Sequence, residues 1–265
     1  MSCTVPSHLY VKCSNGLLAE YRIQESATPW ESRWDALPEE AFRRALRKTG
    51  WWARFGRLFR RWLPRQGIVM DAGCGLGLWV SRLRHRGYHC VGVDLALDSL
   101  RRSHQLRPDL PFTAADVQRL PLPDKSISAY LSMGVVEHFE EGPGWALREA
   151  VRVLKNGGVA LVSVPFLNAL RQTVPLVDRS EAMAGGLAFH QHYFTREQLD
   201  KELYAAGLHP TGVFHGYGVG RVLSDSSIFW KRLLGGKLPI ARLLDYVPFL
   251  PGRYAHMMFT VAVRT

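Results

Sequence analysis

The sequence predicts an α/β fold built around a parallel sheet, and three observations support this. A short apolar segment leads into the glycine-rich stretch "MDAGCGLG" at 70–77, and a helical pattern follows it. A second apolar segment ends at Asp94, and a β-branched run at 159–164 is typical of a buried strand. Strand and helix patterns that alternate in this way are typical of parallel sheets joined by helical crossovers.

Length and composition favour one domain over residues 1–265. The chain has 265 residues and 47% apolar content, enough for a sizeable core. No signal peptide and no transmembrane-length apolar run is apparent, so a cytoplasmic protein is expected. The four cysteines form no Cys-x-x-Cys pair, so reduced thiols are expected rather than a zinc site or a disulfide framework.

The glycine-rich stretch is predicted to be a turn between a strand and a helix. Residues 67–70 form a short apolar segment, and helical spacing begins at the end of the glycine stretch, where Leu76, Val80 and Leu83 share one face. Glycine adopts backbone conformations closed to other residues and lets a ligand approach the main chain. The unpaired N–H groups at the start of the helix face the same place. The turn therefore predicts a ligand site.

The next unit supplies an acid at the expected distance. Residues 88–93 are predicted to form a second strand, and Asp94 follows Gly77 by seventeen residues. In nucleotide-binding units, an acid about 20 residues beyond the glycine turn accepts hydrogen bonds from ribose hydroxyls. The alternative interpretation is that Asp94 only caps the following helix.

Two residues disfavour a dinucleotide as the ligand. The third glycine of the dinucleotide pattern would stand where this chain has Leu78. Asp71 would repel a pyrophosphate, whereas it suits a cation or an amine. S-adenosylmethionine carries an amino group, a sulfonium and a ribose without any phosphate. An NAD-dependent oxidoreductase is therefore the weaker alternative.

Five stretches, in order, carry a resemblance to a known family. They are "VMDAGCGLG", "VGVDLA", "AADVQRLPLPDKSIS", "YLSMGVVEHF" and "EAVRVLKNGGVALVSVP". The chain resembles the class I S-adenosylmethionine-dependent methyltransferases, of the broad type 11 group that includes quinone-biosynthesis methyltransferases. The resemblance is strong over residues 67–165 and continues weakly over 190–210. It departs from the family at Ser126–Ser128, where Ser-Phe-Asp is usual, and near the N-terminus, which lacks the usual Tyr-Asp.

The resemblance implies a Rossmann-like fold. We expect a seven-stranded, mostly parallel sheet with helices on both faces and an antiparallel last strand, the final two strands lying near 208–215 and 256–264. A helical N-terminal cap (1–66) would precede the cofactor-binding core (67–165). An acceptor-side half (166–265) would carry a helical insertion at about 224–252. Thr195 and Gln198 have capping-box spacing, and Gly207 is expected to end that helix.

The resemblance also assigns the cofactor residues. Asp94 would bind the ribose, Asp116 the adenine amine, and Asp71 with the glycine turn the methionine end of S-adenosylmethionine, which leaves as S-adenosylhomocysteine. The full predicted cofactor set is Asp71, Ala72, Gly73, Cys74, Gly75, Gly77, Asp94, Leu95, Asp116, Val117 and Met133.

Methyl transfer from a sulfonium is an in-line displacement, so holding the acceptor close to the methyl carbon is the main task. A base helps when the acceptor carries a proton. His138, after the predicted fourth strand, is the catalytic candidate because its ordinary pKa suits neutral pH. The alternative is that His138 orders its loop or packs on the cofactor.

The acceptor side is predicted from weaker signals. Trp30 and Trp34 are candidates for an aromatic lid, and His190, His192 and Tyr193 for the acceptor pocket. The histidines of "FHQHYF" lack a nearby carboxylate or cysteine, so no metal site is predicted. The stretch "SMGVVEH" lacks the pattern of adenine and cytosine amino-methyltransferases. A small-molecule acceptor is therefore expected, lipids and specialised metabolites included, and no nucleic acid; the apolar stretch 224–252 favours a hydrophobic or lipid-like acceptor.

Residues 41–65 contain nine basic side chains and no acid, with aromatic and aliphatic residues at helical spacing. This basic amphipathic segment predicts either a peripheral contact with an anionic membrane or acidic partner, or packing on its own domain.

The apolar and basic stretch 224–252 could likewise close over a bulky acceptor, rest on a membrane or form an ordinary cap. A non-catalytic cofactor-binding or membrane-docking scaffold is the remaining functional alternative. No feature of the sequence indicates an oligomeric state.

Overall fold

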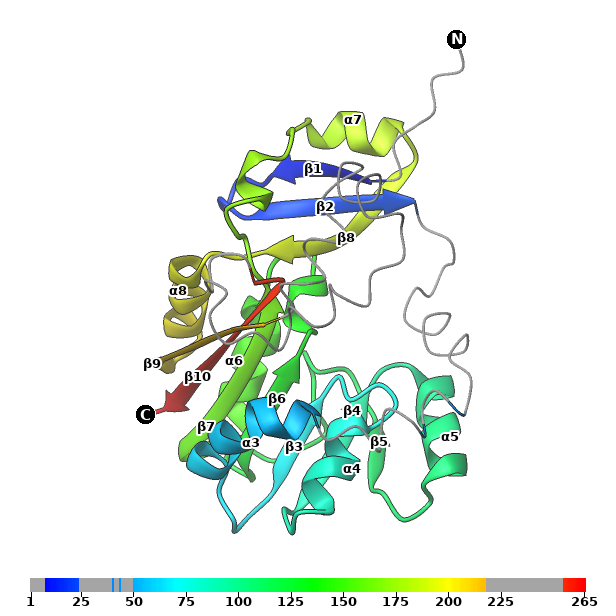
Figure 1. The fold of residues 1–265 in the computed structure, drawn as a ribbon, viewed down its shortest axis with the longest axis vertical. Coiled ribbons are helices and arrows are strands. Elements are labelled where there is room, and N and C mark those ends of the chain that lie inside the picture. The colour runs from blue at the N-terminus through cyan, green and yellow to red at the C-terminus, as the bar shows by residue number, and fades with distance from the viewer. Residues whose placement is uncertain (1–7, 24–39, 41–42, 44–49, 218–254) are drawn as a thin grey trace.

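A computed structural model describes residues 8–23, 40, 43, 50–217 and 255–265. Two sheets are present in this part of the chain, one of seven strands and one of three (Figure 1). The strands of the larger sheet lie in the order β5-β4-β3-β6-β7-β10-β9. They are β3 (Val69–Ala72), β4 (Cys90–Asp94), β5 (Phe112–Ala114), β6 (Ile127–Met133), β7 (Leu154–Pro165), β9 (Leu208–Tyr217) and β10 (Met257–Arg264).

The large sheet confirms the predicted fold class. Strand β10 runs antiparallel to both β7 and β9, whereas the pairs among β3 to β7 are parallel. The last two strands lie where they were expected. Adjacent residues of a strand face opposite sides of its sheet. Leu161 of β7 accordingly belongs to one hydrophobic cluster, and its neighbours Ala160 and Val162 belong to the other.

These two clusters show that helices cover both faces of the sheet. Helices α3 (Gly50–Trp62), α4 (Leu78–Arg84) and α5 (Leu97–Leu106) contribute buried side chains to one face. Helices α6 (Gly144–Val153) and α8 (Arg196–Ala206) contribute them to the other. Helix α8 begins with the predicted capping box at Thr195 and ends at Gly207, whose φ of 96° suits glycine.

Helix α3 is the described part of the basic amphipathic segment. Phe55 and Phe59 are fully buried, and both meet the Trp79 ring edge-on with centroids 5.9 and 5.2 Å apart. Arg57 and Arg61 lie on the exposed side. The apolar stripe of α3 therefore packs on its own sheet, as the core-packing alternative requires. Within the described ranges no helix is long and apolar enough to cross a membrane.

A second sheet, which we call the small sheet, corrects the expectation of a helical N-terminal cap over residues 1–66, because residues 8–23 contribute two strands to it. It joins β1 (His8–Lys12), β2 (Leu18–Ile23) and β8 (Leu187–Tyr193) in the order β1-β2-β8 (Figure 1). Helix α7 (Arg179–Ala184) packs on one face through Ala182. The stretch 8–23 alternates polar and apolar residues around Asn15-Gly16, which is a hairpin signal rather than a helical one.

The boundaries of the predicted divisions are not tested by the structure. The insertion at 224–252 lies outside the described residues, as do the greater part of residues 24–49 and the first seven residues.

Candidate functional site

The glycine turn lies at the carboxyl end of β3, immediately before α4. Gly73, Gly75 and Gly77 have φ values of 77°, 51° and 68°, in the left-handed region that favours glycine. A Cβ atom on Gly73 would lie 2.4 Å from Val135 Cγ2, and one on Gly77 would lie 2.4 Å from Phe112 Cε1. Backbone conformation and close packing therefore both require glycine here, as the sequence predicted.

Asp94 ties the turn to the next strand. Its Oδ2 accepts a hydrogen bond from the Gly75 N–H at 2.7 Å, and its Oδ1 accepts one from the Ala96 N–H at 2.8 Å. The N-cap residue of α5 is Ala96, so Asp94 does not itself occupy the helix-capping position. Each carboxylate oxygen retains a lone pair after these bonds, which suits hydroxyl groups of a ribose.

Asp71 is a buried carboxyl at the same edge of the sheet. Its exposed fraction is 1%, and its Oδ2 has no hydrogen-bond partner among the described residues. Burial, and secondarily the negative charge of Asp94, raise the pKa of Asp71 to about 7. An unsatisfied carboxylate of this kind is costly unless a cation or donor approaches it. The residues present therefore fit a ligand with a cationic amine.

The predicted adenine segment begins with Asp116 and Val117. Asp116 Oδ1 accepts a hydrogen bond from the Gln118 N–H at 2.8 Å, which closes a local turn, and Val117 is buried. Leu95, which directly follows Asp94, is 72% exposed and offers an apolar surface to a planar ring. Met133, also assigned to the cofactor, is half-buried at the end of β6.

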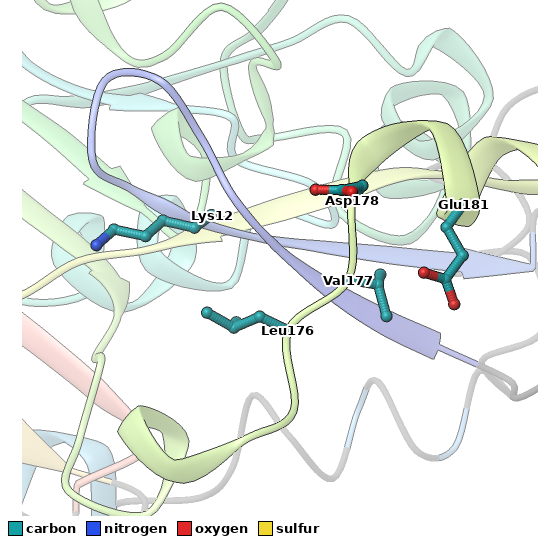
Figure 2. A pocket seen from close by; sticks show the side chains of 5 residues that line it. All are labelled: Lys12, Leu176, Val177, Asp178 and Glu181. Atoms are coloured by element: carbon teal, nitrogen blue, oxygen red, sulfur yellow. The ribbon is translucent and has the colours of Figure 1, made fainter.

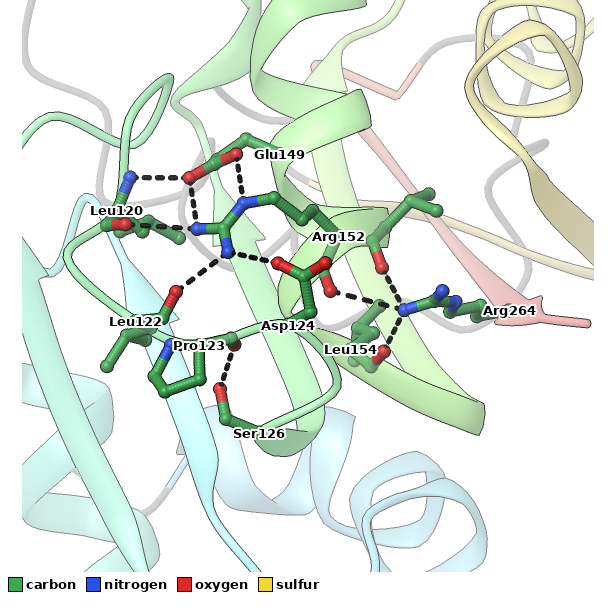
Figure 3. A network of polar contacts seen from close by, with 10 residues as sticks. Leu120, Leu122, Pro123, Asp124, Ser126, Glu149, Arg152, Leu154 and Arg264 are labelled. Carbon is green, nitrogen blue, oxygen red and sulfur yellow. Dashed lines mark hydrogen bonds and ion pairs between the residues drawn. The ribbon is translucent and has the colours of Figure 1, made fainter.

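Two residues missed by sequence reasoning hold this segment in place. Arg152 of α6 donates hydrogen bonds to the carbonyls of Leu120 at 3.0 Å and Leu122 at 2.7 Å (Figure 3). Glu149 accepts one from the Leu120 N–H at 2.6 Å and pairs with Arg152 at 2.7 Å. The spacing of Glu149 and Arg152, three residues apart on a predicted helix, was a signal for their pairing.

The remaining residues of the turn contribute main chain and packing. Ala72 and Cys74 are buried. Burial, and then the charges of Asp71 and Asp94, raise the pKa of the Cys74 thiol well above its ordinary value. A protonated buried thiol is a poor nucleophile.

His138 ends a short 3-10 helix (Val136–His138) that follows β6. Its Nδ1 lies 2.8 Å from the His190 carbonyl oxygen. A carbonyl oxygen only accepts, so Nδ1 carries the proton and the neutral ring has its lone pair on Nε2. Nε2 lies 3.8 Å from Glu137 Oε1, and the rings of His138 and His190 meet edge-on at 5.6 Å. The structure thus brings two predicted site residues together.

The other predicted acceptor residues have different surroundings. His192 is fully buried, its Nε2 lies 3.1 Å from the Glu140 carbonyl oxygen, and burial lowers its pKa. Tyr193 donates a hydrogen bond to Glu20 Oε2 at 2.6 Å. Trp30 and Trp34 lie outside the described residues. Among the described residues, no group of three His, Cys, Asp or Glu side chains is arranged to hold a metal ion.

A pocket of about 370 Å³ lies beside the small sheet, where β1 meets the segment that leads into α7 (Figure 2). Its lining residues are Lys12, Leu176, Val177, Asp178 and Glu181. None of these belongs to the predicted cofactor or acceptor residues, so this pocket is separate from the candidate site.

The strand order, the glycine turn after β3 and the acid that ends β4 define a class I S-adenosylmethionine-dependent methyltransferase fold. Comparison with known proteins supports the same class of fold. Residues 70–162 match the model of a family described as "Methyltransferase domain". Residues 70–162, about a third of the chain, are therefore similar to a methyltransferase domain.

Two curated relatives illustrate the similarity. The chain is 27% identical over 187 residues to a probable S-adenosylmethionine-dependent methyltransferase of Mycolicibacterium smegmatis, which covers 67% of this chain and 68% of the relative. It is 33% identical over 104 residues to the malonyl-[acyl-carrier protein] O-methyltransferase of Serratia marcescens, or 39% of this chain. The chain spans only about two fifths of that relative's length, 40%.

One solved structure is similar over nearly the whole chain. It is the 1,6-didemethyltoxoflavin-N1-methyltransferase of Burkholderia thailandensis, with bound 1,6-didemethyltoxoflavin and S-adenosylhomocysteine. The TM-score is 0.53 at 16% identity, and the match covers 98% of this chain and 100% of that one. At this identity the likeness shows the fold.

Proposed function

We propose that this protein transfers the methyl group of S-adenosylmethionine to a small-molecule acceptor and releases S-adenosylhomocysteine. The observation that supports this proposal most is the arrangement of Asp71 and Asp94 at the glycine turn. Asp94 is tied to the turn through Gly75, and Asp71 has a buried carboxylate oxygen without a partner in the described part of the chain. This arrangement offers anionic acceptors to an amine and to hydroxyl groups while repelling a pyrophosphate.

The chain's own residues would hold the cofactor in three places. Asp71 and the N–H groups of the turn would bind the methionine end, and Asp94 would bind the ribose hydroxyls. Asp116 and Val117 would bind the adenine, in a segment that Arg152 and Glu149 fix to α6. The bound cofactor supplies an electrophilic methyl group on a sulfonium. The protein's main contribution would be to orient an acceptor in line with it.

His138 would remove a proton from the acceptor. Its tautomer supports this role because the Nδ1–H is directed to the His190 carbonyl, which leaves the lone pair on Nε2. His190 would line the acceptor pocket beside His138. We also assign His192 and Tyr193 to the acceptor side, where they belong to the same strand as His190.

Relatives with this fold act on chemically different acceptors, as the two names above show. We propose a hydrophobic or lipid-like small molecule for this chain, on the composition of residues 224–252, which lie outside the described part. The test is methyl transfer from radiolabelled S-adenosylmethionine to a panel of acids, phenols and amines. Tight cofactor binding without transfer to any acceptor would favour the non-catalytic scaffold instead.

Replacing Asp94 by alanine should weaken the binding of S-adenosylhomocysteine by about 1–3 kcal/mol, because hydrogen bonds to a charged group are lost. Calorimetric titration measures the change. Asp98→Ala is the matched control, since Asp98 is an exposed carboxylate of α5 that pairs with Arg101. Equal affinity of wild type and Asp94→Ala would contradict the ribose assignment.

Replacing His138 by glutamine should lower kcat by about 10²–10⁴-fold, the usual contribution of a general base. The dissociation constant of S-adenosylhomocysteine should stay unchanged, because His138 is not assigned to the cofactor. His104→Gln, an exposed residue of α5, is the control. A His138→Gln variant with wild-type kcat would show that no base acts at this position.

A further inference from the structure

A buried polar cluster lies within the small sheet, and no role in methyl transfer has been assigned to most of it. Glu20 of β2 is only 1% exposed, yet it accepts three side-chain hydrogen bonds. Arg22 Nε donates at 2.6 Å, Gln191 Nε2 at 3.0 Å and the Tyr193 hydroxyl at 2.6 Å. We call these four residues the Glu20 cluster.

The cluster lies on one face of the small sheet. Gln191 is paired with Glu20 in the strand register, and Tyr10 of β1 is the partner of Glu20 on the other side. The opposite face is apolar and packs on α7 through residues that include Val11, Ala19 and Phe189. A sheet with one buried apolar face usually leaves the other to solvent. Here the second face instead buries the ionised carboxylate of Glu20. Burying a charge costs stability, which indicates that this carboxylate has a function.

Glu20 remains ionised. Burial alone would raise the pKa of Glu20, but the charge of Arg22 and the hydrogen bonds from Arg22 and Tyr193 outweigh burial and lower it. A second guanidinium, that of Arg171, lies 4.4 Å from the centroid of the Tyr193 ring. With two guanidinium groups and one carboxylate, the formal charge of this group of side chains is positive, which suits an anion.

Arg22 differs from its partners because its side chain is 48% exposed while that of Glu20 is buried. Glu20 holds the guanidinium by its Nε atom. A guanidinium held in this way keeps its two Nη groups in a fixed plane, the geometry that binds a carboxylate through two parallel hydrogen bonds. Glu20 therefore orients Arg22, and Arg22 is the member that can meet a ligand.

The Glu20 cluster is linked to the candidate base. Gln191 of the cluster directly follows His190 in β8, and the His190 carbonyl accepts the Nδ1–H of His138 at 2.8 Å. Strand β8 thus connects the residue beside His138, which is His190, to the Glu20 cluster. An acceptor held near His138 would have this polar face of the small sheet within its surroundings.

We propose that Arg22, oriented by Glu20, binds a carboxylate group of the methyl acceptor, so that the substrate class is a hydrophobic carboxylic acid. This inference rests on the proposed function, because it concerns the acceptor of the same reaction. The protein's net charge of +11 adds to it, since a positive field raises the local concentration of anionic small molecules.

The test compares matched acids and amides on the complex of the protein with S-adenosylhomocysteine. Octanoate and benzoate are titrated calorimetrically beside octanamide and benzamide. We expect saturable binding of the acids at least tenfold tighter than that of the amides. Arg22→Gln should abolish this preference, and Arg22→Lys should retain only part of it, because lysine keeps the charge without the planar fork. Circular dichroism melting confirms that each variant is folded.

Arg101→Gln is the matched control, because Arg101 is also an exposed arginine paired with a carboxylate, at 2.9 Å, but on α5. It removes the same charge and should leave the preference unchanged. Three results would overturn the proposal: no saturable binding of the acids, equal binding of acids and amides, or a preference that survives Arg22→Gln. Failure of S-adenosylhomocysteine to bind would instead count against the proposed function, and the acid and amide titrations can still be read on the protein alone.

Discussion

Replacing Asp71 by asparagine is expected to stabilise the ligand-free protein at pH 8 and, at the same time, to weaken its binding of S-adenosylhomocysteine. The pKa of Asp71 is raised to about 7 in the folded protein, against an ordinary value of 3.8. Folding therefore favours the protonated carboxyl, and ionising it above pH 7 costs up to about 4 kcal/mol at 1.36 kcal/mol per pH unit. Asparagine carries no charge at any pH and removes this cost.

The sign of the pH dependence follows from the same shift. An acid with a raised pKa in the folded state makes the protein less stable as the pH rises from about 4 to about 7. Urea unfolding should show that wild type loses about 2–3 kcal/mol between pH 5 and pH 8 through this group, whereas Asp71→Asn loses less. If the free energy of unfolding falls by the same amount in wild type and in Asp71→Asn between pH 5 and pH 8, the assigned pKa of Asp71 is wrong.

Cofactor affinity should depend on pH in the opposite direction. The ionised carboxylate is the form that attracts a cationic amine, so S-adenosylhomocysteine should bind wild type more tightly as the pH rises through about 7. Asp71→Asn should bind about 10- to 100-fold more weakly at pH 8, the loss of an interaction between charged groups. If Asp71→Asn is more stable than wild type and binds S-adenosylhomocysteine with the same affinity, Asp71 has only a structural role.

Replacing Arg152 by glutamine is expected to lower both the stability of the protein and its affinity for the cofactor. Arg152 donates to two carbonyls of the predicted adenine segment and pairs with Glu149 and with Asp124 at 2.7 Å (Figure 3). The truncation leaves several polar groups without partners, so the free energy of unfolding should fall by about 2–4 kcal/mol. Affinity for S-adenosylhomocysteine should fall by about tenfold, because the segment at 116–124 is no longer held on α6.

A double-mutant cycle with Glu149→Gln separates this network from a general loss of charge. The two substitutions should be non-additive by about 0.5–3 kcal/mol, because both residues bind the same segment. Arg148→Gln is the control, since Arg148 lies on the same helix but stacks on the exposed ring of Trp145 at 4.5 Å. Equal stability and affinity for Arg152→Gln and Arg148→Gln would contradict the positioning role.

The cofactor half of the fold was predictable because its signals are local. The glycine turn and the capping box at Thr195 each depend on residues a few positions apart. The spacing from Gly77 to Asp94 depends only on one helix and one strand. The structure confirms the resulting elements, including the antiparallel β10, whose place came from the family resemblance.

The small sheet was missed because its decisive pairing is distant. Strand β2 pairs with β8 across more than 160 residues of sequence, and no local pattern marks that partner. The hairpin of β1 and β2 did carry a local signal, Asn15-Gly16 between alternating residues, which the expectation of a helical cap overrode. Glu20 and Arg152 were missed for the same reason, since each acts on a segment far away in the chain.

The central claim is that the glycine turn with Asp71 and Asp94 binds the amino-acid and ribose parts of S-adenosylmethionine. Calorimetric titration with S-adenosylhomocysteine, with NADH as the parallel ligand, tests it most directly. We expect saturable micromolar binding of S-adenosylhomocysteine and no binding of NADH. Binding of NADH without binding of S-adenosylhomocysteine would contradict it.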